Sequence, residues 1–280
     1  MTKSGRTRLT ITLRKDILSQ LDSIIDGERI RNRSHAIEYV LSQNLGPKIH
    51  HALILAGGQG VKMRPFTYEM PKPMIPVKGR PILQHIIESI RNCGITDIVI
   101  VIDKQLGENI KKYFGDGSNF GVKITYIVEK ERAGTAGAIR LAKDKLTEPF
   151  LLYYSDVLAE IDLPAFMEFH KNTGSVMSAA LNATDKFSDY GVVKLQGNTI
   201  VNFVEKPTHN DTFGLVNAGI FLAEPELFDL LPQKTPASLE HDVLPNLAKR
   251  GQLSGYPFSG KWFDISTPEI YERVLKEWQT

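Results

Sequence analysis

The sequence predicts an α/β protein in which a mostly parallel sheet is covered by helices on both faces, preceded by a small module of one strand and two helices. From residue 51 onward, apolar stretches of strand length alternate with stretches of helical periodicity, the pattern of parallel sheets with crossover helices. The first fifty residues instead hold one alternating segment and two short amphipathic segments. Hydrophobic residues make up 42% and charged residues 24% of the chain, as in an ordinary globular protein.

Composition and cysteine content exclude several classes of protein. The longest apolar runs have the length of a strand and fall far short of a bilayer span. The N-terminus is polar and basic and lacks the apolar segment of a secretory signal. Cys93 is the single cysteine, so the chain cannot form an intramolecular disulfide framework or a cysteine-based zinc cluster. We therefore expect a cytoplasmic protein without a membrane partner.

The first fifty residues contain three predicted elements. Residues 7–13 (TRLTITL) alternate apolar and polar side chains, which predicts a half-buried strand. Apolar residues then recur at helical spacing over 17–25, and Gly27 marks the end of this first helix. A second helix is expected to begin near Ser34, a good N-cap residue, and to end at the Gly-Pro pair at 46–47.

This module, residues 1–46, cannot bury a core by itself, and its lone strand leaves both edges unpaired. We therefore expect self-association, as a dimer or higher oligomer, in which a second chain supplies a second strand. Residues 1–50 also carry nine Lys/Arg against five Asp/Glu, a net charge of +4, whereas the remaining 25 Lys/Arg and 27 Asp/Glu give −2. A basic surplus confined to one segment can mark a module that binds a polyanion.

The strand-helix-helix pattern, with its basic and polar strand face, resembles the ribbon-helix-helix family of DNA-binding dimers across residues 5–45. In that family two strands pair into an antiparallel ribbon that enters the major groove of DNA. The resemblance implies that Arg8, Thr10 and Thr12 face base edges and that the amides at the start of the second helix, around Ser34, hold a phosphate. The module is thus predicted to dimerise, and binding of double-stranded DNA is left open.

The second predicted domain, residues 51–280, shows the alternation of a parallel sheet. Predicted strands at 52–56, 98–102, 124–128 and 150–154 alternate with predicted helices at 82–92, 108–114 and 136–146. Right-handed crossovers place the functional loops of such a sheet at the carboxyl ends of its strands.

The loop after the first of these strands is rich in glycine. Strand 52–56 runs directly into the sequence GGQGVKMRP at 57–65, and its three glycines allow backbone N–H groups to press against a triphosphate. Lys62 and Arg64 add positive charge to this loop, and Lys72 brings a third cation on a segment stiffened by prolines. Neither the P-loop nor the Rossmann glycine spacing is present.

Several motifs follow one another along the body in a fixed order. They are L-A-G-G-x-G-x-x-x-R-P-x-T from Leu55, P-K-P-M from Pro71, G-T-A-G-A from Gly134, an aspartate after a strand at Asp156, Y-G-V-V from Tyr190, E-K-P from Glu205, V-N-A-G from Val216 and W-F-D from Trp262. Over about residues 51–278 they resemble the sugar-phosphate nucleotidyltransferase family. The resemblance implies a mostly parallel, Rossmann-like nucleotidyltransferase sheet. It also implies that a nucleoside triphosphate and a sugar 1-phosphate are joined with release of pyrophosphate.

The resemblance assigns roles to individual residues. Asp156 and Asp264 are implied as ligands of Mg²⁺, and an oxygen-only site suits that ion. Lys62, Lys72 and Asp156 are implied as catalytic, because two anions must be brought together and neutralised. The nucleotide is expected to contact Leu55, Ala56, Gly57, Gly58, Gly60, Arg64, Lys72, Gly134 and Thr135, and a side chain at position 134 would block its base. The sugar 1-phosphate is expected to contact Gly191, Glu205, Lys206 and Asn217.

Three departures from the family pattern leave the strength of catalysis open. Val61-Lys62 replaces the usual Thr-Arg, Ser155 replaces the glycine before the metal aspartate, and Ser266 replaces the glycine of D-x-G-T. The alternative is a DNA-binding transcriptional regulator whose transferase-like body senses a nucleotide or nucleotide sugar. The G-T-A-G-A segment resembles mannose 1-phosphate guanylyltransferases more than thymidylyltransferases, which favours GTP and a substrate like mannose 1-phosphate.

Overall fold

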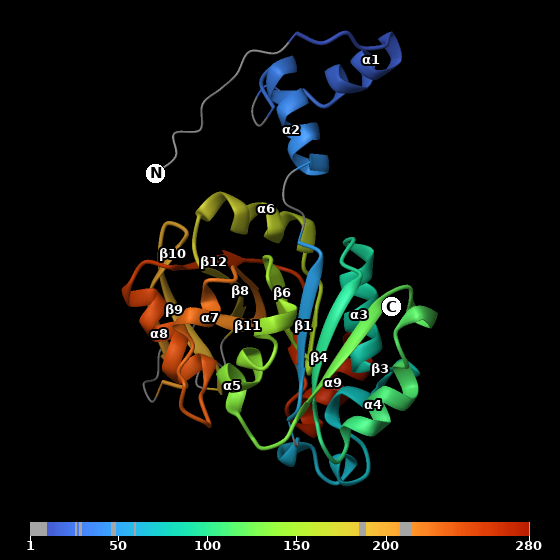
Figure 1. Ribbon diagram of the computed structural model, residues 1–280, viewed down its shortest axis with the longest axis vertical. Helices are drawn as coiled ribbons and strands as arrows, with labels where there is room; N and C mark the ends of the chain where they lie inside the picture. The colour runs from blue at the N-terminus through green and yellow to red at the C-terminus, as the bar shows by residue number, and fades with distance from the viewer. Residues whose placement is uncertain are drawn as a thin grey trace. The chain divides into compact units, whose positions relative to one another are not determined.

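The computed structural model of the chain describes residues 10–25, 27, 30–45, 49–58, 60–184, 189–207 and 214–279. The chain separates into two compact units, Met1–Lys48 and Ile49–Thr280, and Figure 1 labels the elements of both. No helix within these described ranges is long and apolar enough to cross a membrane.

The N-terminal unit contains both predicted helices, α1 (Lys15–Ser23) and α2 (Arg33–Leu45). The Arg33 guanidinium donates two hydrogen bonds to the Asp22 carboxylate, at 2.7 and 2.8 Å, and so joins α2 to α1. A small cluster of buried apolar side chains lies in this unit and consists of Leu21, Ile30 and Ala36.

One detail of the N-terminal prediction is corrected, and a second is not tested by a single chain. Ser34 is not the N-cap of α2, because the Asn32 side chain accepts a hydrogen bond from the His35 amide at 2.9 Å, while Ser34 lies exposed in the first turn. The described part of the predicted strand, residues 10–13, belongs to no strand, and no described segment of this single chain pairs with it. A strand needs paired backbone groups, so one chain alone does not form it. Residues 7–9 lie outside the described residues.

The body is built on a nine-stranded sheet with the order β5-β4-β1-β6-β11-β8-β12-β10-β9. The strands are β1 (His51–Ala56), β4 (Asp97–Asp103), β5 (Lys123–Glu129), β6 (Phe150–Tyr154), β8 (Met177–Thr184), β9 (Gly191–Gln196), β10 (Thr199–Glu205), β11 (Gly214–Ala223) and β12 (Leu253–Pro257). Strands β5, β4, β1 and β6 pair in parallel, as predicted. Strand β11 is antiparallel to both β6 and β8, and β9 and β10 form an antiparallel hairpin. The sheet is therefore parallel in one half and mixed in the other.

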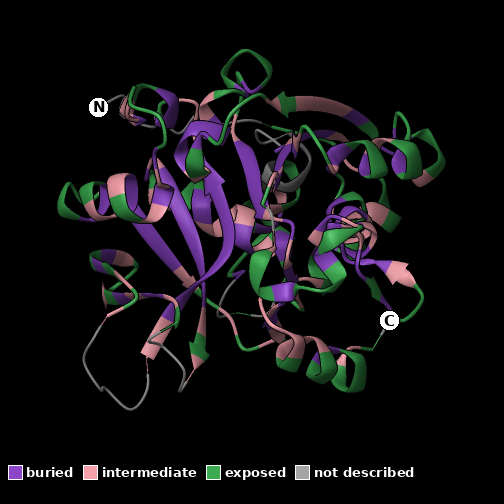
Figure 2. Ribbon diagram, turned by 90° about the horizontal axis from the view of Figure 1, so that it is seen from below, coloured by how far each residue is buried: buried purple, intermediate pink, exposed green. Residues whose placement is uncertain are grey.

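Helices cover both faces of this sheet, which confirms the predicted layering (Figures 1 and 2). Along β1, Ala52 and Ile54 belong to one core cluster and Leu53 to the other, because successive side chains of a strand point to opposite faces. One face is covered by α3 (Ile82–Asn92), α4 (Gly107–Phe114), α6 (Leu163–Thr173) and α9 (Pro268–Glu277). The other is covered by α5 (Gly134–Arg140), α7 (Leu227–Leu230) and α8 (Leu244–Lys249).

Shorter elements complete the body. The helix predicted at 136–146 is divided into α5 and a 3₁₀ turn, η5 (Lys143–Lys145). Other 3₁₀ turns are η1 (Val61–Met63), η2 (Phe66–Tyr68), η3 (Lys72–Met74) and η4 (Ser118–Phe120), and a π-helix, η7, spans Leu239–Val243. Two small antiparallel sheets pair β2 (Pro76–Val77) with β3 (Arg80–Pro81) and β7 (Val157–Ala159) with β13 (Trp262–Asp264).

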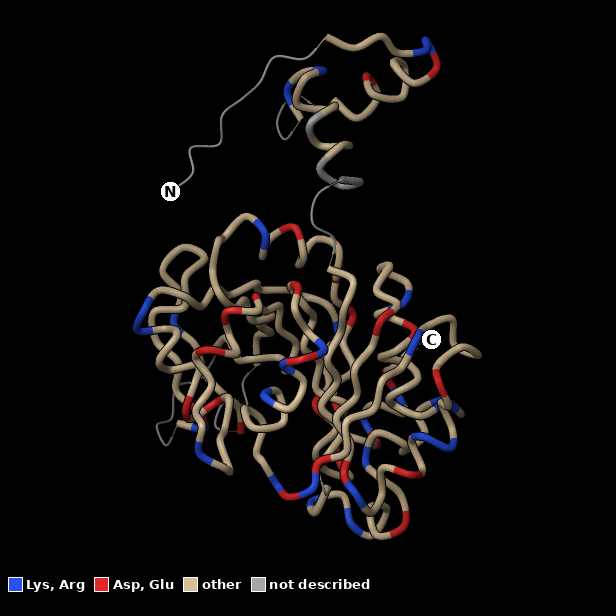
Figure 3. The backbone as a smooth tube through the Cα atoms, in the orientation of Figure 1, with Lys and Arg blue, Asp and Glu red and all other residues tan. Residues whose placement is uncertain are grey.

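Strands β1, β4, β5 and β6 run in parallel, so their carboxyl ends lie on the same side of the sheet. The loops after β1 and β6 carry Gly57 and Asp156, so two of the predicted site segments lie at these carboxyl ends. Figure 3 shows basic and acidic residues interspersed at the lower end of these strands.

Candidate active site

Two aspartates that are far apart in the sequence lie together because of the small β7–β13 sheet. Asp156 directly precedes β7, and Asp264, the last residue of β13, lies opposite Val157 in the antiparallel register. The Ile265 amide donates a hydrogen bond to the Asp156 carbonyl at 2.9 Å. The structure thus brings the two predicted metal ligands to one place.

Lys72 contacts Asp156 directly and interacts with the charge of Asp264. It begins the 3₁₀ turn η3 between two prolines, and its Nζ lies 2.5 Å from Asp156 Oδ2. Only 13% of the Lys72 side chain is exposed. Burial by itself disfavours the ammonium, but the carboxylates of Asp156 and Asp264 outweigh burial and raise the pKa of Lys72 above its usual value. Lys72 is therefore held as a cation at the site.

The surroundings of Asp264 disfavour its ionised form. Burial, followed by repulsion from Asp156, raises the pKa of Asp264 from 3.8 to about 7, and three lysines act in the opposite direction. Those lysines are Lys72, Lys206 and Lys62. The cations that the sequence predicted for the two phosphate substrates are thus gathered around one carboxylate.

The residues present fit a bound Mg²⁺. Asp264 Oδ1 is buried and has no hydrogen-bond partner among the described residues, although a buried carboxylate oxygen ordinarily needs one. A hard cation between the two aspartates would satisfy it. Mg²⁺ commonly binds one or two carboxylates and completes its shell with water and substrate phosphates. The described residues contain no cluster of three or more His, Cys, Asp or Glu that could form an all-protein metal cage.

The glycine-rich loop packs against the segment that carries Lys72. Gly60 has a φ of +59°, and a Cβ there would lie 2.7 Å from Thr67 Cγ2 and 3.3 Å from Lys72 Cβ. The Thr67 hydroxyl donates a hydrogen bond to the Gly60 carbonyl at 2.7 Å. Around Gly58, by contrast, a Cβ would meet nothing within 4 Å. The loop is fixed at Gly60 and open to a ligand at Gly58.

The other predicted nucleotide residues on this side differ in accessibility. Ala56 is buried in β1, and Leu55 is half-buried. Lys62 is exposed on η1. Arg64 is exposed, and its guanidinium lies 4.9 Å from the centre of the Tyr68 ring.

Glu129 is a candidate site residue that the sequence analysis missed. It ends β5, and its Oε1 accepts a hydrogen bond from the Ala133 amide at 2.6 Å. A Cβ on Gly57 would lie 2.7 Å from Glu129 Oε2, so this carboxylate lies directly beside the glycine-rich loop. Its position at the carboxyl end of a parallel strand was the signal that could have identified it.

The G-T-A-G-A segment makes internal contacts that the sequence did not predict. Gly134 has a φ of +74°, and a Cβ there would overlap the Ala237 carbonyl, so the glycine makes room for residue 237. The Thr135 hydroxyl donates to Glu240 Oε2 at 2.8 Å and accepts a hydrogen bond from the Leu239 amide at 2.7 Å. Packing against the protein itself is thus a second reason for a glycine at position 134, besides the predicted access of a base.

The predicted sugar side lies on the β9–β10 hairpin. Gly191 is paired with Glu205, and a Cβ on Gly191 would overlap the Phe203 ring and lie 2.7 Å from Glu205 Oε2. Lys206 has a φ of +46°, and its Nζ lies 3.9 Å from Glu205 Oε1. Burial, followed by the charge of Glu240, raises the pKa of Glu205.

Asn217 is buried in β11, where its side-chain oxygen accepts a hydrogen bond from the Gly219 amide at 3.0 Å. This contact supports an irregularity in the β11–β8 pairing between residues 217 and 221. The predicted sugar-side residues therefore come from β9, from β10 and the residue after it, and from β11. Strand β9 pairs with both β10 and β11.

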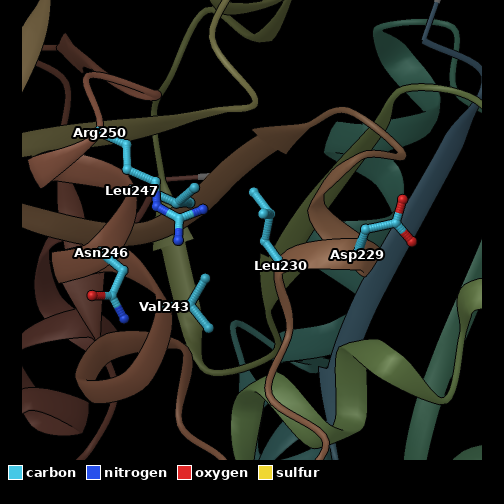
Figure 4. A pocket seen from close by; sticks show the side chains of 6 residues that line it. All are labelled: Asp229, Leu230, Val243, Asn246, Leu247 and Arg250. Atoms are coloured by element: carbon cyan, nitrogen blue, oxygen red, sulfur yellow. The ribbon is translucent and has the colours of Figure 1, made fainter.

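Two pockets on the body do not include any of these residues. One, of about 190 Å³, is lined by α7 and the junction of the π-helix with α8, as Figure 4 shows. The other, of about 470 Å³, lies at the start of β12 and the end of α6, on the opposite edge of the sheet. We therefore define the candidate site by its charged residues and by the glycine-rich loop.

A glycine-rich loop, two neighbouring aspartates and three lysines come together at the carboxyl ends of parallel strands, an arrangement suited to phosphate compounds. The chain belongs to the nucleotidyl transferase family, whose model matches residues 51–279. The matched region includes every aspartate and lysine of the candidate site and none of the N-terminal unit.

Individual relatives agree with this family. The chain is 37% identical over 228 residues to the mannose-1-phosphate guanyltransferase of Saccharomyces cerevisiae, covering 78% of this chain and 62% of the relative. It is 35% identical over 228 residues to mannose-1-phosphate guanyltransferase 2 of Candida glabrata, again covering 78% of this chain and 62% of the relative. The chain therefore spans less than two thirds of the length of these relatives.

Solved structures share the fold. A candidate glucose-1-phosphate thymidylyltransferase from Bacillus anthracis superposes with a TM-score of 0.76 at 26% identity, covering 83% of this chain and 97% of that one. HddC from Yersinia pseudotuberculosis superposes with a TM-score of 0.70 at 24% identity, covering 82% of this chain and all of that one. At this level of identity, the second similarity concerns the fold alone.

Proposed function

We propose that the body transfers a nucleotidyl group from a nucleoside triphosphate to a sugar 1-phosphate and releases pyrophosphate. The observation that carries this proposal is the contact of Lys72 with a pair of aspartates, Asp156 and Asp264, beside the glycine-rich loop. The family membership and the relatives named as mannose-1-phosphate guanyltransferases support it.

In this reaction a phosphate oxygen of the sugar 1-phosphate attacks the α-phosphorus of the triphosphate. The new O–P bond forms as the bond from the α-phosphorus to the bridging oxygen breaks, and that oxygen leaves with the pyrophosphate. Because both reactants are anions, neutralising their charge and placing them in line matter more than proton transfer. The proposed catalytic role of the protein is therefore electrostatic.

Each charged side chain has a proposed place in this step. Lys62 and Lys72 bind the phosphates of the nucleotide, and Lys206 binds the phosphate of the sugar. Asp156 and Asp264 would hold Mg²⁺, which would supply positive charge to neutralise the phosphates. Glu205 is acceptor-only when ionised and receives hydrogen bonds from sugar hydroxyls, together with Gly191 and Asn217.

Glu129 supports a preference for GTP. A carboxylate only accepts hydrogen bonds, and guanine offers adjacent N–H donors at N1 and N2 that uracil and thymine do not have. Glu129 lies beside Gly57 in the loop that is proposed to bind the triphosphate. The base of the same nucleotide can therefore reach this carboxylate. We therefore propose GTP and a substrate like mannose 1-phosphate.

The test is pyrophosphate release by the purified chain with Mg²⁺ and each pairing of GTP, ATP, UTP, CTP or dTTP with mannose 1-phosphate or glucose 1-phosphate. The proposal expects turnover that needs both substrates and is highest with GTP. Asp156→Asn should remove turnover while the circular dichroism spectrum stays the same. A chain that binds nucleotide but releases no pyrophosphate with any pair would favour a sensor of nucleotides or nucleotide sugars.

For the N-terminal unit we propose self-association. Ile11 and Leu41 are 44% and 45% exposed, although both are large apolar side chains in a unit with a very small core. Analytical ultracentrifugation should show a dimer or higher oligomer at micromolar concentration, and removal of residues 1–46 should abolish the association. An intact chain that sediments as a monomer contradicts the proposal.

Binding of double-stranded DNA by this unit is tested with the same protein. Thr10 and Thr12 are exposed, whereas Arg8 lies outside the described residues. If the unit reads DNA, a duplex should bind at low salt and Arg8→Ala should weaken binding without changing the oligomer. If no duplex is bound even at low salt, the unit serves association alone.

A further inference from the structure

Glu240 is held by three hydroxyl groups from three different segments. It is the second residue of the π-helix Leu239–Val243, and its Oε2 accepts hydrogen bonds from Thr135 Oγ1 and Ser238 Oγ, each at 2.8 Å. Its Oε1 accepts a hydrogen bond from the Tyr154 hydroxyl. One carboxylate therefore joins the first turn of α5, the residue before the π-helix and the end of β6.

The location of Glu240 links the parts of the candidate site. Thr135 belongs to the predicted base-recognition segment, and Tyr154 ends the strand that leads to Asp156. The negative charge of Glu240 also contributes, after burial, to the raised pKa of Glu205 on the sugar side. Glu240 thus lies between the segments proposed to bind the nucleotide, the metal and the sugar.

The contacts around Glu240 leave α5 little freedom to shift. The Ala136 amide donates to the Ala237 carbonyl at 3.0 Å, and the Ala237 amide donates to the Ala133 carbonyl at 2.8 Å. The Thr235 hydroxyl accepts a hydrogen bond from the Arg140 guanidinium at 2.9 Å. Residues 235–240 and the whole of α5 are therefore joined along their length.

The hydrogen bonds to Glu240 are of the stronger kind. Bonds to an ionised carboxylate are shorter and stronger than those between neutral groups. Burial and then the charge of Glu240 raise the pKa of Tyr154 well above its usual value, which keeps its hydroxyl protonated as a donor. A π-helix inserts one extra residue into a helical turn and is frequent at functional sites. Here it places a carboxylate within reach of helix α5 and of the end of strand β6.

We infer that Glu240 is a positioning residue of the active site, which fixes the first turn of α5 against the end of β6 and so sets where the nucleotide lies relative to Asp156 and Asp264. The inference rests on the proposed function. Glu240 acts through Thr135 and Tyr154, and no contact with a reacting atom is required of it.

The test compares Glu240→Gln and Glu240→Ala with a matched control, Asp229→Asn. Asp229 also ties this region to the segment after α5, through an ion pair with Lys143 at 3.0 Å, but both side chains are exposed. For each protein, the Kd for GTP is measured by calorimetry without sugar 1-phosphate, together with Tm, kcat and the KM of each substrate.

Glu240→Ala should raise the GTP Kd by about tenfold or more and lower kcat, because charge-assisted hydrogen bonds that hold α5 are lost. Glu240→Gln should show a smaller effect, since its amide oxygen still accepts hydrogen bonds, and Asp229→Asn should match the wild type. The measurements are made well below every Tm, where a purely structural residue would leave Kd and kcat unchanged. If Glu240→Ala does not fold, Glu240→Gln decides the question.

A Thr135→Val and Glu240→Gln double-mutant cycle shows whether Glu240 acts through Thr135. The two effects on the GTP Kd should be less than additive, because either change breaks the same contact. If GTP binding and kcat are unchanged in both Glu240 variants, the inference is overturned and the proposed function stands. If the wild type binds no triphosphate and releases no pyrophosphate, the proposed function and the inference fail together.

Discussion

Replacing Asp264 with asparagine should stabilise the fold and remove activity at the same time. Burial and repulsion from Asp156 raise the pKa of Asp264 from 3.8 to about 7. Between about pH 4 and about pH 7, this carboxyl is mostly protonated in the folded protein and mostly ionised in the unfolded chain. The free energy of unfolding therefore falls as pH rises through this range. A difference of about 3 pKa units corresponds to up to about 4 kcal/mol. Asparagine keeps the shape of the side chain without this charge.

The assay is urea unfolding of the wild type and Asp264→Asn in EDTA, from about pH 4 to about pH 8. Near the acid end, the two proteins should have the same free energy of unfolding. Towards neutral pH, the free energy of unfolding of the variant should exceed that of the wild type by a growing amount. Asp229→Asn, with an exposed carboxyl, is the control and should show no such trend. Added Mg²⁺ should stabilise the wild type more than Asp264→Asn, and pyrophosphate release should be lost in the variant. A stability difference that does not change with pH would refute the reasoning, because Asp264 would then ionise as an ordinary surface carboxyl.

Four further outcomes are expected. Lys62→Arg should keep or raise kcat/KM, whereas Lys62→Ala should lower it by about tenfold, because one charged contact with a phosphate is lost. If neither variant changes kcat/KM, the glycine-rich loop does not bind the triphosphate. Glu129→Gln should lower kcat/KM for GTP about tenfold relative to UTP, and an unchanged base preference would contradict the place given to Glu129. Burial lowers the pKa of His170 from 6.5 to about 4, so the wild type should lose up to about 3 kcal/mol as pH falls between these values and His170→Gln should not, measured by urea unfolding at both ends. Deleting residues 1–46 should leave a folded body that still releases pyrophosphate; an insoluble body would show that the two units depend on each other.

The parallel half of the sheet could be predicted closely from the sequence. The predicted strands 98–102 and 124–128 each lie one residue inside the observed β4 and β5, and the helix predicted at 82–92 coincides with α3. Strand β4 is buried on both faces, so it is a continuous apolar run between two aspartates, which makes its limits visible. Strand β5 lies at the edge of the sheet and is only partly buried, but its run of β-branched and aromatic residues also ends at charged residues. The N-cap of α2 was less visible, because Asn32 and Ser34 are both good capping residues and lie two positions apart.

Other features depend on contacts that no local pattern records. Nothing in the sequence near Asp156 indicates that β7 pairs with β13, so the family resemblance alone joined Asp156 to Asp264. The contact of Thr135 with Glu240 spans 105 residues, and Glu240 belongs to a π-helix, which has no simple periodicity. Strand β11 was not predicted as the element that turns the sheet antiparallel, because an apolar strand carries no direction in its composition.

Two of the three departures from the family pattern, Ser155 and Ser266, lie beside the acidic pair and leave it in place. Ser155 is buried, and its amide donates to the Leu55 carbonyl at 3.3 Å, so β6 reaches Asp156 in register with β1. Ser266 bonds through its amide to the Asp264 carbonyl at 2.8 Å, which supports the turn after that aspartate. The repulsion between the two carboxylates destabilises the fold, a cost that is understandable where a cation is held beside phosphates. Because a sensor of Mg²⁺-bound nucleotide would use the same pair, release of pyrophosphate, and not the pair itself, separates an enzyme from a regulator.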